Sequence, residues 1–372
     1  MAWNLDAQNS SSVQANSTTD TMSSNFLLYG ANGYTGALIA RLAVQRGLRP
    51  ILAGRNPEKV EPLSTELDLE YRAFSLEHEA AVDEALADVA VVLHCAGPFS
   101  QTSKPMVDGC LRTKTHYLDI TGEVAVFEAI AARDAEAKAA AVMLLPGAGF
   151  DVVPSDCLAA HLKVRLPDAT RLALGFQALG LISRGTATTM VEAQHQGGLV
   201  RRDQVLTPVP AAWKTRMIDF GRGPVEATTI PWGDVSTAYY STGIPNIEVY
   251  AAFPASTRRA MVASRYLGWL LGLPAVQNFQ KRLIQKQPPG PTDAERLGGR
   301  SLLWGEVENN SGKRLVSRLQ GPEGYTLTAL TALAIVAKVL AGQIAVGFQT
   351  PSLAYGADLI LEIEGVVREE SG

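Results

Sequence analysis

Cysteine and basic charge are both scarce in this sequence. The 372 residues include three cysteines, an odd number without metal-ligand spacing, which predicts a reducing compartment and neither a disulfide framework nor a metal site. The formal net charge is −4, so no basic excess indicates a nucleic-acid partner. Because 47% of the residues are hydrophobic and 19% are charged, global disorder is excluded and a sizeable core over two domains is expected.

Residues 1–24 lack the features of a targeting segment. They contain no lysine or arginine and no apolar core, and serine, threonine, asparagine and glutamine dominate them. This composition differs from that of secretory signal peptides and of transit peptides. We therefore expect a disordered tail and a cytoplasmic protein, and the sequence leaves open whether Met22 is the true start.

Long hydrophobic runs are also missing. Residues 261–276 are apolar and flanked by arginine and lysine, but they are short for a membrane span and contain Pro274. The same pattern suits a helix lying in a membrane interface. We favour a helix packed in the second domain or at an oligomer interface, and keep peripheral membrane contact through 261–276 and a homodimer as alternatives.

What the sequence does contain is a glycine-rich turn between a predicted strand and a predicted helix. The apolar segment 26–29 is followed by three glycines in the pattern G-x-x-G-x-x-G. In a dinucleotide-binding βαβ unit, such glycines let the backbone approach a pyrophosphate, and the helix N-terminus supplies free N–H donors. The residues that we assign to this phosphate turn are Gly30, Asn32, Gly33, Tyr34, Thr35 and Gly36.

The end of the second predicted strand indicates which dinucleotide binds. This position usually carries an acidic residue that holds the ribose 2′-hydroxyl, but here the strand ends in Gly54 and Arg55. A guanidinium group suits a 2′-phosphate, because it donates charge-assisted hydrogen bonds to phosphate oxygens. The expected cofactor is therefore NADP(H).

Strand and helix patterns alternate from residue 25 to about 165, which requires a parallel sheet with right-handed crossovers. We predict an α/β protein with a Rossmann-type doubly wound parallel sheet and an inserted α+β second domain. The strands are expected at 26–30, 50–54, 70–74, 89–95, 116–120 and 141–145, and helices between them include 34–47, 78–87, 102–113 and 123–140.

After residue 167, short alternating segments predict a second, mostly antiparallel sheet. Asn309–Gly312 form a hairpin signal between two of its strands, and 288–299, rich in proline and glycine, predict a loop. The strands are expected at 171–177, 226–230, 247–253, 301–308 and 314–320, with a helix over 325–340. The predicted units are the tail 1–24, an NADP-binding domain 25–150, a substrate and dimerisation domain 151–323, and a returning C-terminal segment 324–372.

Three successive strand ends carry glycine loops with acidic residues, at the edge where doubly wound sheets bind ligands. Asp119, Glu123 and Asp156 each have a structural alternative, because a carboxylate also suits the first turn of a helix. Cys95 is expected to be a small buried residue, and His195 suits a helix C-terminus. The loops are Cys95–Phe99, Asp119–Glu123 and Pro146–Asp156.

These stretches together resemble the saccharopine dehydrogenase-like NADP-dependent oxidoreductases, in particular the branch of trans-acting enoyl reductases. The resemblance implies NADP(H) on the glycine turn and Arg55, with Ala96, Gly97 and Pro98 near the nicotinamide. The sequence departs from the family where Arg184 precedes Gly185-Thr186, a place at which glycine is common. The matching stretches are Tyr29–Gly36, Ala53–Arg55, Cys95–Phe99, Tyr117–Glu123, Gly149–Asp156 and Gly321–Lys338.

The resemblance favours an NADPH-dependent reductase of lipid metabolism, acting on a carbon–carbon double bond of an apolar acyl or polyketide-like substrate, small or acyl-carrier-linked. The candidate proton donors are Tyr117, Asp119 and His195. One alternative is saccharopine-type C–N chemistry through an imine, although the spacing of the arginines at 184, 201 and 202 indicates no carboxylate clamp. Another is a non-catalytic NADP-binding or lipid-surface scaffold.

Overall fold

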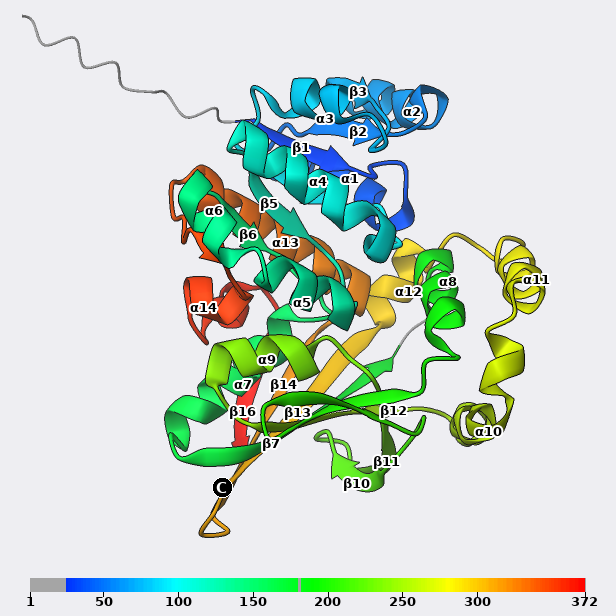
Figure 1. Cartoon of the computed structure of the whole chain (residues 1–372), viewed down its shortest axis with the longest axis vertical. Coiled ribbons are helices and arrows are strands. Elements are labelled where there is room, and N and C mark those ends of the chain that lie inside the picture. Colours follow the sequence, from blue (N-terminus) through cyan, green and yellow to red (C-terminus); the bar gives the residue numbers. More distant parts are fainter. Residues whose placement is uncertain (1–24, 180–181, 372) are drawn as a thin grey trace, which may run out of the picture.

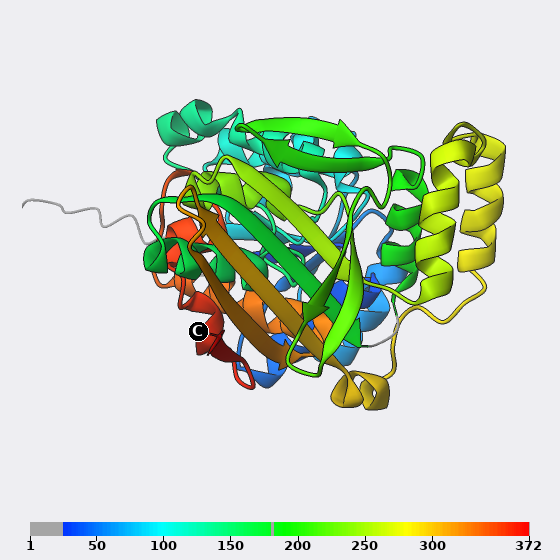
Figure 2. The same cartoon turned by 90° about the horizontal axis from the view of Figure 1, so that it is seen from below.

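A computed structural model describes residues 25–179 and 182–371. The predicted tail at 1–24 lies outside the described residues. Two sheets dominate the molecule, one near the top of Figure 1 and one below it, with helix α13 (Gly324–Leu340) running beside the first. Figure 2 shows the second sheet from below, where its long strands cross the face of the molecule.

The first sheet is parallel throughout and has the strand order β15-β6-β5-β4-β1-β2-β3. The order reverses after β3, where the chain passes to β4 beside β1, so the sheet is doubly wound as predicted. β1, β2 and β4 are buried along their whole length, as parallel strands covered on both faces must be. The strands are β1 Phe26–Tyr29, β2 Ile51–Gly54, β3 Tyr71–Ala73, β4 Val91–His94, β5 His116–Asp119, β6 Met143–Leu145 and β15 Gly347–Phe348.

Helices cover this sheet at the expected places, with one difference. The single helix predicted over 123–140 is two helices, separated by a turn at which Arg133 reaches the carboxylates of Asp108 and Glu136. The helices are α1 Tyr34–Gln45, α2 Pro57–Leu67, α3 Glu79–Leu86, α4 Phe99–Thr113, α5 Val124–Ala131 and α6 Asp134–Ala140.

The second sheet is mixed, with the main order β10-β11-β12-β7-β13-β14-β16 and β8 and β9 branching from β12. β7 and β12 are parallel and the other pairs antiparallel, so the prediction of a mostly antiparallel sheet is confirmed. The hairpin predicted at Asn309–Gly312 joins β13 to β14. The strands are β7 Ala169–Leu179, β8 Gly198–Arg202, β9 Val205–Val209, β10 Thr215–Asp219, β11 Pro224–Thr229, β12 Asn246–Ala252, β13 Arg300–Asn309, β14 Arg314–Pro322 and β16 Val367–Ser371.

The segment 288–299, predicted as a loop, contains a short helix. Thr292 and Glu295 form a capping box, in which each side chain accepts a hydrogen bond from the other residue's backbone N–H, and this pair offsets the breaking effect of the neighbouring prolines. The remaining helices are α7 Val153–Arg165, α8 Arg184–Ala193, α9 Asp234–Thr242, α10 Ala255–Leu271, α11 Pro274–Ile284, α12 Asp293–Gly298, α14 Pro351–Tyr355 and the 3₁₀ helix η1 Leu359–Glu362.

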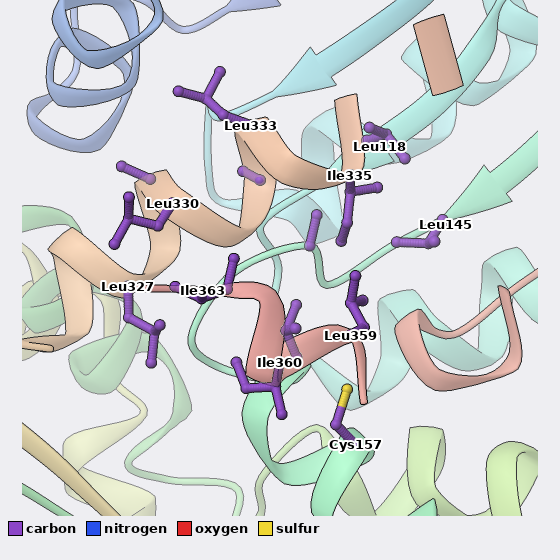
Figure 3. Packing of buried hydrophobic residues seen from close by; sticks show 14 of the residues in the cluster. Leu118, Leu145, Cys157, Leu327, Leu330, Leu333, Ile335, Leu359, Ile360 and Ile363 are labelled. Carbon is purple, nitrogen blue, oxygen red and sulfur yellow. The ribbon is translucent and has the colours of Figure 1, made fainter. Parts of the chain in front are cut away.

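Helix α13 occupies the centre of the core. Ten of its seventeen residues are buried, as expected for a helix that is apolar on nearly all sides. Figure 3 shows Ile335 of α13 above Leu359 of η1, with Cys157 of α7 below Leu359 and Ile360. The same cluster reaches strand residues of the first sheet, so α13 joins the two layers.

Truncation of α13 tests this role. Replacing Leu333, which is 1% exposed, by alanine should lower the free energy of unfolding by about 2–5 kcal/mol, because a cavity remains in the shared core. The matched control is Leu297→Ala, at a side chain that is 80% exposed, for which a change within about 0.5 kcal/mol is expected. Denaturant unfolding measures both, and equal losses would contradict the assignment.

Candidate functional site

Two of the three motif glycines are required by packing. Gly30 has φ of +85°, and a Cβ added there would lie 2.8 Å from the backbone N of Ala96. At Gly36 a Cβ would lie 2.3 Å from the carbonyl oxygen of Gly30. The turn after β1 is therefore pressed against both α1 and the loop after β4, so larger residues would separate these parts.

Gly33 differs, because the fold alone does not demand a glycine there. Its φ is −76° and its ψ is 164°, an extended conformation open to any residue, and the nearest atom to an added Cβ is 3.3 Å away. Gly33 is exposed at the N-cap of α1, where no side chain caps the helix and the first turn contains no acidic residue. By contrast, Asn56 caps α2 and Glu323 caps α13. The N-terminus of α1 is thus open to an anion from outside the chain.

Arg55 lies where a ribose 2′-phosphate would be held. It follows β2 directly, and the tight space at Gly54, where a Cβ would lie 2.9 Å from Oδ1 of Asn32, places this strand end beside the glycine turn. Among the described residues, Arg55 is exposed and forms no hydrogen bond or ion pair. An unpaired guanidinium beside an open helix N-terminus fits NADP(H).

Tyr34 connects the glycine turn to the segment before α12 and to α13. Its hydroxyl donates to the carbonyl of Pro291 at 2.6 Å and accepts from Arg296 at 3.0 Å. Its ring meets that of Tyr325, at the start of α13, edge to face with centroids 5.1 Å apart. Thr35, next along α1, is half-buried. The glycine turn is therefore bordered by the segment before α12 and by α13.

The loop after β4 is held rigidly beside the turn. The Thr102 hydroxyl donates to the carbonyl oxygen of Ala96 at 2.7 Å and contacts that of Pro98 at 3.1 Å, and Gly97 between them is exposed. Glu123 accepts hydrogen bonds from the backbone N–H groups of Phe99 and Ser100 at 2.8 and 3.0 Å. Glu123 thus caps α4, one strand away, rather than the helix that follows it.

Tyr117 and Asp119 are paired with each other inside the protein. The Tyr117 hydroxyl donates to Asp119 at 2.7 Å, and the backbone N–H groups of Thr121 and Gly147 donate to the other carboxylate oxygen at 2.9 and 2.8 Å. Burial raises the pKa of Asp119 to about 6, while these hydrogen bonds lower it. Both side chains are fully buried, so the pair ties the ends of β5 and β6 together, and its role as a proton donor stays a prediction.

His195 lies in a different place. It follows the C-terminus of α8, as the sequence predicted, and is exposed. Its ring lies against Gly272 of the α10 C-cap and 3.5 Å from the amide of Gln277 on α11. The structure therefore does not bring His195 together with Tyr117 and Asp119, and its contacts are with the α10–α11 pair.

Asp151 is a candidate that the sequence reasoning passed over. It lies in the loop after β6, and a Cβ built at Gly122 would be 2.8 Å from its Oδ2. Burial raises the pKa of its carboxyl group to about 7, yet part of the residue remains open to solvent. No hydrogen bond to this carboxyl group is formed within residues 25–179 and 182–371. Asp151 is therefore an acid able to gain and lose a proton near neutral pH.

Three half-buried aromatic rings form a connected group beside the loop of Asp151. Trp232 donates from its indole N–H to the Asp151 carbonyl oxygen at 2.8 Å. Its ring lies 4.6 Å from that of Phe176 on β7, which in turn lies 6.0 Å from the ring of Phe150. The loop that carries the candidate acid thus lies beside an apolar group of rings from the loop itself, from β7 and from the segment between β11 and α9.

Comparison with known proteins agrees with this geometry. Residues 26–145 match the family model described as the saccharopine dehydrogenase NADP binding domain. This segment, about a third of the chain, is thus similar to the NADP-binding domains of that family. It contains the phosphate turn, Arg55 and the loop after β4, so NADP(H) is the cofactor that it binds.

Curated relatives resemble the same part of the chain. A trans-acting enoyl reductase of Mycobacterium ulcerans (strain Agy99) is 31% identical over 149 residues, which cover 37% of this chain and 35% of that protein. A human saccharopine dehydrogenase-like oxidoreductase is 26% identical over 153 residues, covering 36% and 35%. The matches thus span about a third of the length of these relatives.

A solved structure extends the likeness in fold to nearly the whole chain. Saccharopine dehydrogenase (L-Glu forming) from Saccharomyces cerevisiae, in its apo form, superposes with a TM-score of 0.64 over 94% of this chain and 100% of that one. The sequence identity is 14%, so this comparison concerns the fold alone. The two-sheet arrangement of the NADP-binding domain and its partner sheet is therefore shared with that enzyme.

Arg55 provides the first test of the cofactor site. Arg55→Gln should weaken NADPH binding about 10- to 100-fold and leave NADH binding unchanged, because only the 2′-phosphate needs the charge-assisted bonds. Fluorescence titration with each cofactor measures the two affinities. Arg46→Gln, at an exposed arginine at the far end of α1, is the matched control and should bind like the wild type. Equal weakening of NADPH and NADH binding by Arg55→Gln would refute the 2′-phosphate role.

Gly33 provides the second test. Gly33→Val should abolish binding of both NADPH and NADH, since a branched side chain at the exposed N-cap blocks approach of the pyrophosphate. The free energy of unfolding without cofactor should fall by no more than about 1–2 kcal/mol, because valine is a poorer N-cap than glycine and its Cβ would lie 3.3 Å from the Gly30 carbonyl oxygen, while the extended backbone is open to any residue. Calorimetric titration and denaturant unfolding measure these quantities. Undiminished binding would show that the glycine turn is only structural.

Proposed function

We propose that this protein is an NADPH-dependent oxidoreductase that reduces the carbon–carbon double bond of an α,β-unsaturated apolar acyl group, free or carried on an acyl carrier. The observation that carries the proposal is the aromatic surface of Phe150, Phe176 and Trp232 around Asp151. An apolar acyl chain suits such a surface, and a carbonyl-conjugated double bond needs one hydride and one proton.

The arginines of the second domain support an apolar substrate. Arg201 is 5% exposed and donates to the carbonyls of Val235 and Gln204 and to the carboxylate of Glu128. Arg184 donates to the carbonyl oxygen of Gln287, and Arg202 stacks on Trp213. All three guanidinium groups thus have structural partners, and they do not form the convergent clamp that a multi-carboxylate substrate such as saccharopine would require.

In the proposed reaction, the cofactor supplies the hydride and a side chain supplies the proton. NADPH, when bound, supplies the hydride, which adds to the carbon β to the carbonyl. The neutral Asp151 carboxyl group gives its proton to the α carbon, so the double bond is saturated and Asp151 becomes a carboxylate that water reprotonates. The aromatic surface holds the acyl chain and excludes water from the reacting carbons.

Asp151→Asn tests the proton donor. We expect kcat with NADPH and a long-chain 2-enoyl thioester to fall about 100-fold or more, because an amide cannot supply the proton. The acid form predominates below the pKa of about 7, so the wild-type rate should fall as pH rises through 7 and the variant should lose this dependence. NADPH affinity should not change. Asp203→Asn, at an exposed turn, is the matched control and should keep the wild-type profile.

The substrate class is tested with the same assay. NADPH oxidation is followed with the long-chain 2-enoyl thioester, with a short one, and with an amine and a keto acid that form an imine. The proposal expects turnover of the long-chain thioester and little with the short one. Turnover of the imine mixture alone would contradict it in favour of C–N chemistry, and NADPH binding without any turnover would favour a non-catalytic protein.

A further inference from the structure

Helix α10 packs on the protein by one narrow face. Ser264, Gly268 and Gly272 recur every four residues along that face, and a Cβ added at Gly268 or Gly272 would lie within 3.6 Å of His195 atoms. None of the residues of α10 is buried. The prediction of a helix packed in the second domain therefore holds for one side of α10, which also includes the half-buried Met261 and Leu271.

The opposite face of α10 is apolar and exposed. Val262, Tyr266, Trp269 and Leu270 lie on it at helical spacing, the pattern that usually faces a core, and the exposed Leu273 follows just after the helix. Tyr266 is 78% exposed and Trp269 74% exposed. A contiguous surface of this kind on a helix marks an interaction site rather than scattered surface hydrophobicity.

Helix α11 repeats this arrangement. Its inner face meets α8, where Lys281 pairs with Glu192 at 2.5 Å and Gln280 accepts a hydrogen bond from Gln194 at 2.6 Å. Phe279, 63% exposed, and the exposed Arg282 lie three residues apart on α11, and the exposed Lys286 follows just after the helix. Figures 1 and 2 both place α10 and α11 at the outer edge of the molecule, away from the first sheet.

All the charged residues of this helix pair are basic. Residues 255–286 contain six lysines and arginines and no aspartate or glutamate, in a chain whose net charge is −4. Arg258, Arg265 and Lys281 contact neighbouring parts of the protein. Within the described chain, the other three cations, Arg259, Arg282 and Lys286, are exposed and have neither hydrogen-bond nor ion-pair partners.

We propose that the outer faces of α10 and α11 dock on an anionic lipid membrane. The aromatic and leucine side chains enter the boundary between headgroups and acyl chains, and the three unpaired cations contact anionic headgroups, as in interfacial amphipathic helices. None of the described helices is both long and apolar enough to cross a bilayer. This contact therefore lies in the plane of the membrane, and it does not depend on the reaction that the protein catalyses.

Co-sedimentation with lipid vesicles tests the proposal on the full chain. The protein should bind vesicles made of an equal mixture of phosphatidylcholine and phosphatidylserine. It should bind vesicles of phosphatidylcholine alone far more weakly, and binding to the mixed vesicles should be lost at high salt. Trp269→Glu should abolish binding, because it places a charge in the apolar layer. Val164→Glu changes a side chain that is 75% exposed on α7 and is the matched control, which should bind like the wild type.

The cations are tested separately with the triple variant R259Q/R282Q/K286Q. Each cation near an anionic surface contributes about five-fold to affinity (about 1 kcal/mol), so the triple variant should bind phosphatidylserine vesicles on the order of 100-fold more weakly. All variants should keep the NADPH affinity of the wild type, which shows that they are folded. Loss of vesicle binding with unchanged NADPH affinity supports the proposal.

Two results would overturn it. One is the absence of vesicle binding by the wild type, or equal binding of the wild type and Trp269→Glu. The other is a wild-type dimer in analytical ultracentrifugation that Trp269→Glu converts to a monomer, because a second copy of the chain would then cover these helices.

Discussion

The burial of α13 between the two sheets is the constraint on which the rest of the structure depends. Its apolar surface forms the shared core, and two threonines on it fix the loop after β6. Thr331 donates to the carbonyl oxygen of Ala148 at 2.9 Å, and Thr328 accepts from the backbone N–H of Phe150 at 3.0 Å. Tyr325 at the start of the helix contacts Tyr34 of the cofactor turn. The same helix therefore positions the cofactor turn and the loop of Asp151.

The segment between α11 and α12 links the outer helices to the cofactor turn. Gln287 and Pro289 accept hydrogen bonds from Arg184 of α8, and Pro291 accepts one from Tyr34 of α1. The chain thus passes from the exposed helix pair directly to the border of the dinucleotide site. In this arrangement, a protein docked through α10 and α11 carries its cofactor turn at a fixed position relative to the membrane.

Local patterns in the sequence predicted six of the seven described strands of the first sheet, because most of them are apolar runs bounded by turns and the segments between them have helical periodicity. The seventh strand, β15, is two residues long and was not predicted. The glycine spacing and Arg55 could be assigned for the same reason, since a βαβ unit places them close together through a short stretch of chain. The helix at Asp293–Gly298 could not be predicted from local patterns, because prolines and glycines dominate its surroundings and a single capping box decides its conformation.

The polar residues at the strand ends were harder to interpret, because their roles arise from contacts between distant segments. Tyr117 and Asp119 are buried and hydrogen-bonded to each other, and Asp119 also accepts from the backbone N–H of Gly147 after β6, while their role as proton donors stays a prediction. Asp151 has no distinguishing neighbour in sequence. Its raised pKa comes from burial where loops from two strand ends meet, beside Gly122 and close to Trp232, which donates to its carbonyl oxygen.

The most direct test of the account is to follow hydrogen transfer from NADPH deuterated at C4 to a long-chain 2-enoyl thioester, using mass spectrometry and NMR of the product. The account predicts a saturated acyl product with deuterium on the carbon β to the carbonyl and a solvent-derived proton on the α carbon. Deuterium on a carbon bonded to nitrogen in an imine-derived product, with no transfer to the thioester, would contradict it.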